Sequence, residues 1–154
     1  MKVHLPAYPA GVHRIREDLT PAELELDPAV FRAVHADLRL DRHDPYLQFE
    51  FRLQADVELQ CDRCLIDFVS TVEVRSPMIY VLGSPTRGEA IDDPDLTVLP
   101  AHTTEVDLTT DLRDALILGL PGKRLCDEAC RGLCPHCGAD LNDRDCGCAP
   151  PADN

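Results

Sequence analysis

The hydrophobic pattern is clearest between Leu47 and Cys61, where apolar and polar residues alternate without interruption. The apolar members are Leu47, Phe49, Phe51, Leu53, Ala55, Val57 and Leu59. A period of two predicts a strand with one buried face and one solvated face, and this alternation favours an antiparallel sheet. Because the run is longer than the roughly 3–10 residues of a usual strand, we expect a bent strand in a strongly coiled sheet or a partial barrel.

Two weaker runs with the same period flank this strand, one upstream of the turn-forming stretch Asp41 to Pro45 and one downstream of Cys64. The pattern predicts three consecutive antiparallel strands, at about 32–41, 46–60 and 65–76. Pro77 is expected to end the third strand. Further short strands are expected at Met78 to Leu82 and between Leu96 and Val106.

The best helix candidate runs from Asp107 to Leu118. Its apolar face consists of Leu108, Leu112, Ala115 and Leu116. Asp107 is expected to cap the N-terminus, and Gly119 with Pro121 to end the helix. A second helix start, at Thr20-Pro21-Ala22-Glu23, has the composition of a capping box but is expected to give only about one turn, because Pro28 soon follows.

Together these elements predict an α+β fold, with a bent antiparallel sheet or partial barrel, one main helix and a cysteine-rich C-terminal tail. We expect a sheet domain at residues 1–122, a zinc-binding cysteine-rich segment at 123–148 packed on it, and a loose tail at 149–154. Residues 83–95 have the composition of a flexible surface loop.

The charge balance is strongly acidic, with 15 Lys+Arg against 28 Asp+Glu and a formal net charge of −13. Binding to a phosphate backbone needs a basic footprint, which the chain as a whole does not offer. An acidic surface suits a basic protein partner, because opposite charges steer encounter, although the same charge also keeps a protein in solution. No apolar run reaches transmembrane length and the N-terminal stretch lacks a signal-peptide core, so we expect a cytoplasmic protein without membrane association.

Eight cysteines stand in four close pairs, Cys61-x2-Cys64, Cys126-x3-Cys130, Cys134-x2-Cys137 and Cys146-x-Cys148. In a reducing compartment such pairs indicate metal ligands, and zinc takes four thiolates in a tetrahedron, so eight thiols suffice for two structural zinc ions. The favoured partition is a local site in the tail and a second site that joins the tail to the tip of the hairpin. The local site has Cys134, Cys137, Cys146 and Cys148, and the second has Cys61, Cys64, Cys126 and Cys130; other partitions remain open.

Other uses of the cysteines and their neighbours have less support. Disulfides are rare in the cytosol, and a catalytic redox pair is usually seated at a helix N-terminus, whereas Cys61 and Cys64 lie between antiparallel strands. Complete four-thiolate sites leave no open position for catalysis. His136 is expected to be a solvent-facing spacer, and the acidic run Asp92 to Asp95 lacks the remaining positions of a calcium loop.

Two stretches of the sequence resemble one known family. The first is Cys61-Asp62-Arg63-Cys64-Leu65, which follows the alternating strand. The second contains Val106-Asp107-Leu108, residues 115–121 and residues 126–142, and it ends with Cys146 and Cys148. Together they resemble the YceD family, the large ribosomal RNA subunit accumulation proteins. The resemblance implies a role in accumulation of large-subunit ribosomal RNA, in bacteria and plant plastids, with no known enzymatic activity and no small-molecule substrate. It carries over no functional residues beyond the cysteine motifs.

These expectations combine into one hypothesis: a non-catalytic factor in large ribosomal subunit biogenesis that binds a basic ribosomal protein or assembly factor and associates with ribosomal RNA indirectly. Direct RNA contact would have to use the cations around the cysteines, Arg63, Lys123, Arg124 and Arg131, for which charge compensation of the thiolates is the favoured role. The alternative is a thiol-based redox or zinc-handling protein that uses the same cysteines. A nucleic-acid-binding zinc module is disfavoured by the net charge.

Overall fold

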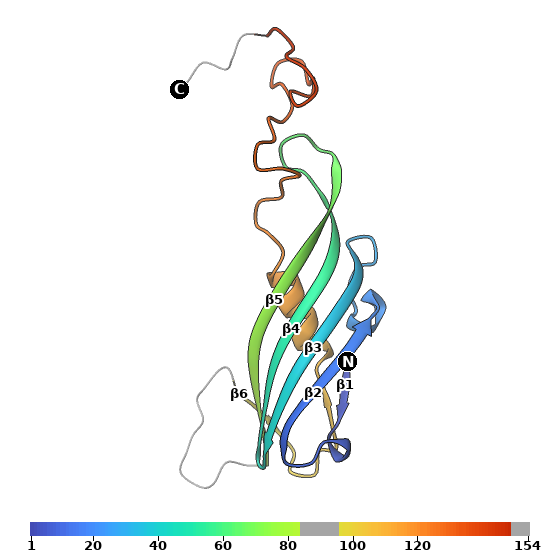
Figure 1. Ribbon diagram of the computed structural model, residues 1–154, viewed down its shortest axis with the longest axis vertical. Helices are drawn as coiled ribbons and strands as arrows, with labels where there is room; N and C mark the ends of the chain where they lie inside the picture. The colour runs from blue at the N-terminus through green and yellow to red at the C-terminus, as the bar shows by residue number, and fades with distance from the viewer. Residues whose placement is uncertain (84–95, 149–154) are drawn as a thin grey trace. The chain divides into compact units, whose positions relative to one another are not determined.

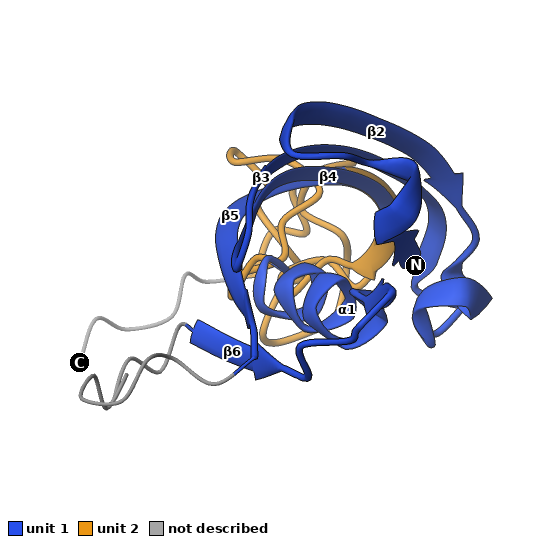
Figure 2. Ribbon diagram, turned by 90° about the horizontal axis from the view of Figure 1, so that it is seen from below, with its two compact units in different colours: residues 1–57, 71–120 blue, residues 58–70, 121–154 orange. Residues whose placement is uncertain are grey.

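The computed structural model describes residues 1–83 and 96–148. The chain forms two compact units, which we call the sheet unit (residues 1–57 and 71–120) and the cysteine unit (residues 58–70 and 121–154) (Figure 2). The expected flexible loop, from residue 84 on, its acidic run, and the expected loose tail at 149–154 lie outside the described residues. No helix in the described ranges is long and apolar enough to cross a bilayer.

Strands dominate the secondary structure of the described residues, which also contain one α-helix (Figure 1). The strands are β1 (Lys2–His4), β2 (Gly11–Leu19), β3 (Phe31–His43), β4 (Tyr46–Gln60), β5 (Asp67–Leu82), β6 (Leu96–Leu99) and β7 (Glu105–Asp107); the helices are the 3-10 turns η1 (Leu5–Ala7) and η2 (Pro21–Leu24) and the α-helix α1 (Thr109–Leu118). One sheet has the order β2-β3-β4-β5-β6, and β1 pairs with β7. The α+β class is confirmed, and the sheet is bent but not closed into a barrel.

The core of the sheet unit forms where the alternation predicts it. All seven apolar residues of β4 are buried, with exposed fractions between 0 and 6%. The matching residues of β3 are Val34, Ala36, Leu38 and Leu40, all buried as well. The antiparallel register places Leu38 opposite Phe51 and Leu40 opposite Phe49, so the apolar faces of the two strands coincide. Strands β2 to β5 curve around α1, which covers this face (Figure 2).

Helix α1 packs Leu112 and Leu116 into the core, as the spacing predicts. The expected cap is wrong by one position, because the residue before the helix is Leu108 and not Asp107. The Asp107 carboxylate still serves the helix start, since Oδ1 accepts the backbone N–H of Thr109 at 2.9 Å.

The end of α1 depends on Gly119, which donates its N–H to the Ala115 carbonyl at 2.9 Å. A Cβ atom at Gly119 would collide with the side chain of Val74 in β5. The glycine therefore allows the helix to approach the sheet closely at its C-terminal end.

Two expectations for this region are wrong: that the third strand ends at Pro77, with a separate strand at Met78 to Leu82, and that the sheet is antiparallel throughout. β5 does not end at Pro77 but continues to Leu82, and the strand that follows pairs with it in parallel, Ile79 with Leu96 to Leu82 with Leu99. Among the described residues this parallel pairing begins only after Pro77. Proline lacks a backbone donor and is tolerated in strands at such edge positions.

The N-terminal region contains a strand that the pattern does not reveal. β2 pairs with β3 over nine positions, but only Ile15 and Leu19 of its residues are buried. An edge strand with so few buried positions shows little alternation. The turn that follows is as predicted: η2 is one turn long, and the Glu23 carboxylate accepts the N–H of Thr20 at 2.7 Å.

Candidate metal centre

The first half of the site is a tight turn between β4 and β5. Cys61 follows the last residue of β4, and its N–H donates to the Ile66 carbonyl at 2.8 Å. Leu65 donates in return to the Cys61 carbonyl at 3.0 Å and has a positive φ of 62°. This backbone geometry places Cys61 and Cys64 on the same turn, and both are buried.

The second half of the site is the segment that carries Cys126 and Cys130, which backbone and side-chain hydrogen bonds hold against this turn. Asp62 and Arg124 bind each other twice through backbone groups: the Asp62 N–H donates to the Arg124 carbonyl at 2.8 Å, and the Arg124 N–H donates to the Asp62 carboxylate at 2.7 Å. Arg63 donates to the Cys130 carbonyl at 2.6 Å. The polar residues between the two cysteines of the turn therefore position the other cysteine pair.

The same segment also contacts the backbone of Arg63 at Gly132 and Leu133. The N–H of Leu133 donates to the Arg63 carbonyl at 3.0 Å, and a Cβ on Gly132 would lie 2.9 Å from that carbonyl oxygen. Gly132 also has a φ of 75°. Both the close approach and the left-handed backbone require glycine at this position.

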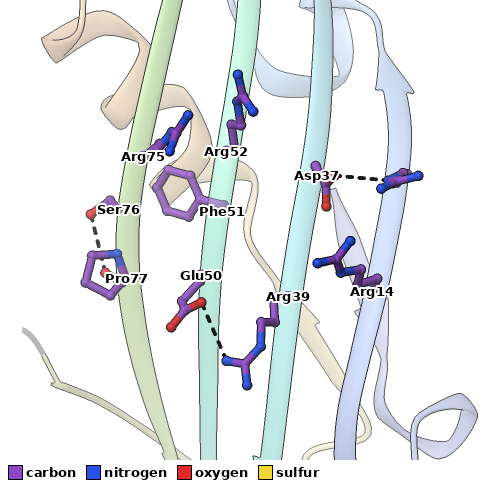
Figure 3. Close-up of a pocket in the computed structure, with 10 residues that line it drawn as sticks. Arg14, Asp37, Arg39, Glu50, Phe51, Arg52, Arg75, Ser76 and Pro77 are labelled. Atoms are coloured by element: carbon purple, nitrogen blue, oxygen red, sulfur yellow. Dashed lines mark hydrogen bonds and ion pairs between the residues drawn. The ribbon is translucent and has the colours of Figure 1, made fainter.

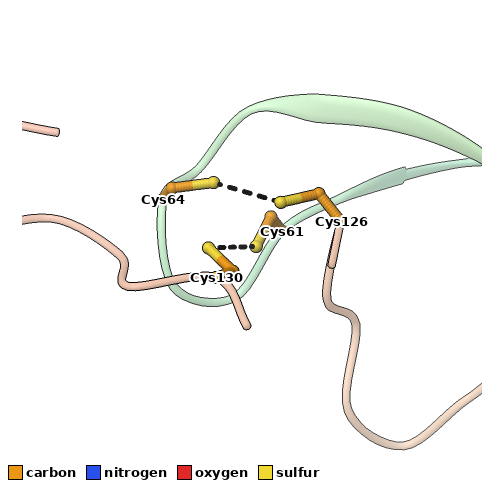
Figure 4. A group of neighbouring side chains, drawn as sticks. All are labelled: Cys61, Cys64, Cys126 and Cys130. Carbon is orange, nitrogen blue, oxygen red and sulfur yellow. Dashed lines mark hydrogen bonds between the residues drawn. The ribbon is translucent and has the colours of Figure 1, made fainter. Parts of the chain in front are cut away.

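The four thiols of this first cluster converge in pairs (Figure 4). The Sγ atoms of Cys61 and Cys130 are 3.8 Å apart, and those of Cys64 and Cys126 are 3.6 Å apart. A disulfide would require about 2.05 Å, whereas four sulfurs at about 2.3 Å from a central zinc are about 3.8 Å from one another. All eight cysteines of the chain are free, and the donor set matches a tetrahedral thiolate site.

The pKa values of the thiols differ within the first cluster. Burial raises the pKa of Cys61, but the backbone N–H groups of Cys126, Cys64 and Arg63 outweigh it and lower the pKa to about 6. Burial, and then the neighbouring thiols, raise the pKa of Cys126 to about 12. One thiolate forms readily in the cluster, and further thiolates repel it unless a cation lies between them.

The second cluster is closed within the C-terminal segment. The Sγ atoms of Cys134, Cys137, Cys146 and Cys148 all lie within 4.8 Å of one another. The turn repeats the geometry of the first, since Gly138 donates its N–H to the Cys134 carbonyl at 2.9 Å and has a φ of 72°. Backbone N–H groups of Cys137 and His136 lower the pKa of Cys134 to about 6. The structure thus separates the cysteines into the two sets of four that the spacing favours.

One residue of this site was not singled out from the sequence. The Asn142 side-chain amide donates to the Sγ of Cys130 at 3.5 Å, while its Oδ1 accepts the N–H of Arg131 at 2.7 Å. Asn142 therefore links the segment of the second cluster to a thiol of the first. The local signal is weak, since a short polar residue in a loop is common, and only the fold brings it to the sulfur.

The cations near the clusters are bound mainly by oxygen atoms. Arg124 pairs with Asp62 at 3.1 Å, and Arg131 pairs with Asp145. Arg63 is held by backbone carbonyls, and Lys123 forms no ion pair with any residue that the structure describes. The structure gives these residues positioning contacts, and none of the described ion pairs or hydrogen bonds joins their charged groups to a thiol. His136 is exposed and belongs to neither cluster, as expected.

Several basic side chains lie together on the polar face of the sheet unit (Figure 3). A groove of about 760 Å³ is lined by Arg14, Arg16, Asp37, Arg39, Glu50, Phe51, Arg52, Arg75, Ser76 and Pro77. Most of its arginines have carboxylate partners: Arg16 pairs with Asp37 at 3.0 Å, and Arg39 with Glu50 at 3.5 Å. Exposed ion pairs of this kind contribute about 0–1 kcal/mol each, and they neutralise much of the basic charge.

Fold and site together define a class of protein, an α+β protein with two separate four-cysteine centres suited to structural metal ions. The sequence matches a family model described as Large ribosomal RNA subunit accumulation protein YceD over residues 49–153. The match covers more than half of the chain, so the chain belongs to the YceD family. The resemblance seen in the cysteine motifs is confirmed.

Two plant relatives carry the family's name, and the matched part of the chain spans only 18 to 39% of the length of three curated relatives. The chain is 40% identical over 58 residues to Large ribosomal RNA subunit accumulation protein YCED homolog 1, chloroplastic, of Arabidopsis thaliana, which is 38% of the chain and 18% of that protein. It is 38% identical over 61 residues to the Zea mays protein of the same name, covering 39% of the chain and 21% of that protein. An uncharacterised protein of Mycobacterium bovis is 29% identical over 82 residues, 53% of the chain and 39% of that protein. No solved structure matches the chain.

Proposed function

We propose that this protein is a non-catalytic factor in large ribosomal subunit biogenesis that supports the accumulation of large-subunit ribosomal RNA. The observation that carries this proposal is membership of the YceD family, whose name states accumulation of large-subunit ribosomal RNA. The plant relatives carry the same role in their names. The family is named for accumulation of an RNA and not for a reaction.

The two cysteine clusters hold structural zinc in this account. The residues are Cys61, Cys64, Cys126 and Cys130 in one site, and Cys134, Cys137, Cys146 and Cys148 in the other. Four converging sulfur donors are the set that zinc prefers in structural sites. When bound, the ion supplies charge that offsets thiolate repulsion and fixes segments that have little apolar core. Asp62, Arg63 and Gly132 contribute by holding the two segments in the alignment that brings the thiols together.

The partner in this proposal is a basic ribosomal protein or assembly factor. The formal charge of −13 favours such a partner and opposes a phosphate backbone. Two four-thiolate zinc sites would lower the net charge by about four more, because each adds about −2. Arg63, Arg124 and Arg131 near the clusters already have oxygen partners, so we infer that association with ribosomal RNA is indirect and that the site of action is the cytoplasm.

A second candidate is a thiol-based redox or zinc-handling protein, which the eight free thiols favour. Metal occupancy separates the two candidates, because permanently filled sites leave no reactive thiol. Alkylation of the native protein before and after chelation gives the answer. Eight thiols that react only after chelation favour the structural role, and rapid reaction without chelation favours thiol chemistry.

Depletion of the protein in its own cells tests the ribosomal role. We expect the ratio of large-subunit to small-subunit ribosomal RNA to fall, and to recover when the wild-type chain is supplied. The matched control is His136→Ala, a change at an exposed residue within the second turn whose side chain belongs to neither cluster, and it should restore the ratio as well as the wild type. An unchanged ratio after depletion would contradict the proposal.

A further inference from the structure

The two cysteine turns have the same backbone but different residues at the same position. In each turn the residue after the second cysteine donates its N–H to the carbonyl of the first, Leu65 to Cys61 at 3.0 Å and Gly138 to Cys134 at 2.9 Å. Both residues have positive φ, 62° for Leu65 and 72° for Gly138. The second turn therefore uses the residue that this conformation favours, and the first uses a leucine.

A leucine is unfavourable at this position on two counts. Its Cβ opposes the left-handed conformation, which glycine and asparagine adopt more easily. Its side chain also gains little from the fold, because it is 55% exposed. Neither backbone geometry nor burial within the chain accounts for Leu65.

Two further exposed apolar residues follow Leu65 closely in the sequence of the cysteine unit. Ile66 and Val69 are 48% and 52% exposed. We call these three residues, which lie within five consecutive positions, the knuckle patch. Clustered exposed apolar residues mark interaction surfaces more often than single ones do.

The charges of the cysteine unit indicate the kind of partner. Its described residues contain eight carboxylate side chains against five Lys and Arg. Asp67 stands between Ile66 and Val69 in the chain, and no ion pair joins it to any residue in the described ranges. A surface with apolar side chains and nearby unpaired negative charge suits a basic protein that presents an apolar side chain beside its cations.

We infer that the knuckle patch is the surface that binds the basic ribosomal or assembly protein of the proposed function. The inference rests on that function for the class of partner. Leu65 is retained at a strained position because its exposed side chain contacts the partner. Stability and binding should then respond to Leu65 in opposite directions.

The variant Leu65→Asn separates the two properties, because asparagine tolerates positive φ and is polar. The matched control is Leu118→Asn, which removes an 84% exposed leucine from the sheet unit. Each tagged full-length chain is purified from its own cells after mild cross-linking and ribonuclease treatment, and ribosomal and assembly proteins are counted per captured chain. Zinc content and the midpoint of thermal unfolding are measured on the same preparations.

We expect Leu65→Asn to reduce capture about three- to tenfold, since binding would bury the exposed half of one leucine side chain and this changes a binding constant by about that factor. Its zinc content should equal that of the wild type and its unfolding midpoint should be equal or higher, while Leu118→Asn should capture as the wild type does. Wild-type capture by Leu65→Asn would overturn the inference and leave the proposed function intact. Loss of zinc in both Leu65→Asn and Leu65→Gly would assign Leu65 to the fold and would also overturn it.

A photo-reactive amino acid at position 65 gives a second readout. We expect cross-links to a basic ribosomal or assembly protein from position 65 and none from position 118. Cross-links from position 65 only to a second copy of this chain would overturn the inference. Absence of ribosomal proteins from the wild-type preparation itself would contradict the proposed function, which distinguishes that failure from a failure of the patch.

Discussion

Replacement of Cys137 by alanine removes one donor from the second cluster and leaves the first cluster complete. All four donors of the second cluster lie between Cys134 and Cys148, and all four donors of the first lie outside that segment. We therefore expect the zinc content of the purified protein to fall from two ions per chain to one. The remaining ion should be held by the first cluster.

The structure also indicates how strongly the folded conformation of residues 134–148 depends on the bound ion. From residue 134 to residue 148, Cys134 is the only buried residue. Apolar burial of about 25 cal/mol per Å² therefore contributes little there. Apparent zinc binding in small structural sites is worth about 10–16 kcal/mol at neutral pH, which exceeds any other contribution within the segment. Loss of the ion should unfold residues 134–148.

Native mass spectrometry counts the bound ions, and amide hydrogen exchange reports the order of the segment. The informative amides are those of Cys134, Gly138 and Leu141, which donate to the carbonyls of Ala139, Cys134 and Gly132. They should exchange at the rate of an unfolded chain in Cys137→Ala.

The matched control is His136→Ala, a change within the same turn at an exposed residue outside both clusters, which should keep two ions and full protection. If Cys134→Ala and Cys137→Ala both kept two zinc ions and wild-type protection, the division of the cysteines into these two sites would be refuted.

Two further predictions concern backbone geometry and charge. Gly132→Ala should lower the free energy of unfolding of the cysteine unit by about 1–3 kcal/mol more than Gly147→Ala does. Both glycines have positive φ, but only a Cβ at position 132 would collide with Arg63. Chemical denaturation of the zinc-loaded variants measures the difference, and equal losses of stability would contradict the prediction. The pKa of Glu73 is lowered to about 2, chiefly by hydrogen bonds from Arg52 and then from other polar side chains, so its stabilising contribution is complete above its usual pKa near 4.5 and is lost as the pH falls from there toward 2. An NMR titration of the Glu73 carboxyl should show this pKa, with Arg52→Gln raising it; an ordinary value in the wild type would contradict the ion-pair geometry.

The sequence predicts the centre of the sheet well because burial there follows the period of the strand. Every apolar position of β4 is buried, and the helix places Leu112 and Leu116 in the core. The edges are harder to predict. β2 is buried at only Ile15 and Leu19, so most of its residues carry no period. The parallel pairing of β6 with β5 joins two segments that are separate in the sequence, and a local hydrophobic pattern does not encode the direction of such a pairing.

The candidate site shows the same division between local and long-range information. Close spacing identifies the cysteine pairs, and counting predicts two groups of four. The partners that align the groups are not visible in this way, because the contact of Asn142 with Cys130 and the close approach of Gly132 to Arg63 exist only in the folded chain. The position of basic residues beside the cysteines predicts charge compensation of the thiolates. In the folded chain, the hydrogen-bond and ion-pair partners of Arg63 and Arg124 are oxygen atoms.

In the proposed function, this acidic protein acts in large-subunit biogenesis by binding a basic protein. The most direct measurement is purification of the tagged chain from its own cells after mild cross-linking, with and without ribonuclease, followed by identification of the co-purified proteins and RNA. We expect a basic ribosomal or assembly protein to be retained after ribonuclease treatment. Loss of all ribosomal material on ribonuclease treatment would contradict it, because RNA would then bridge the contact.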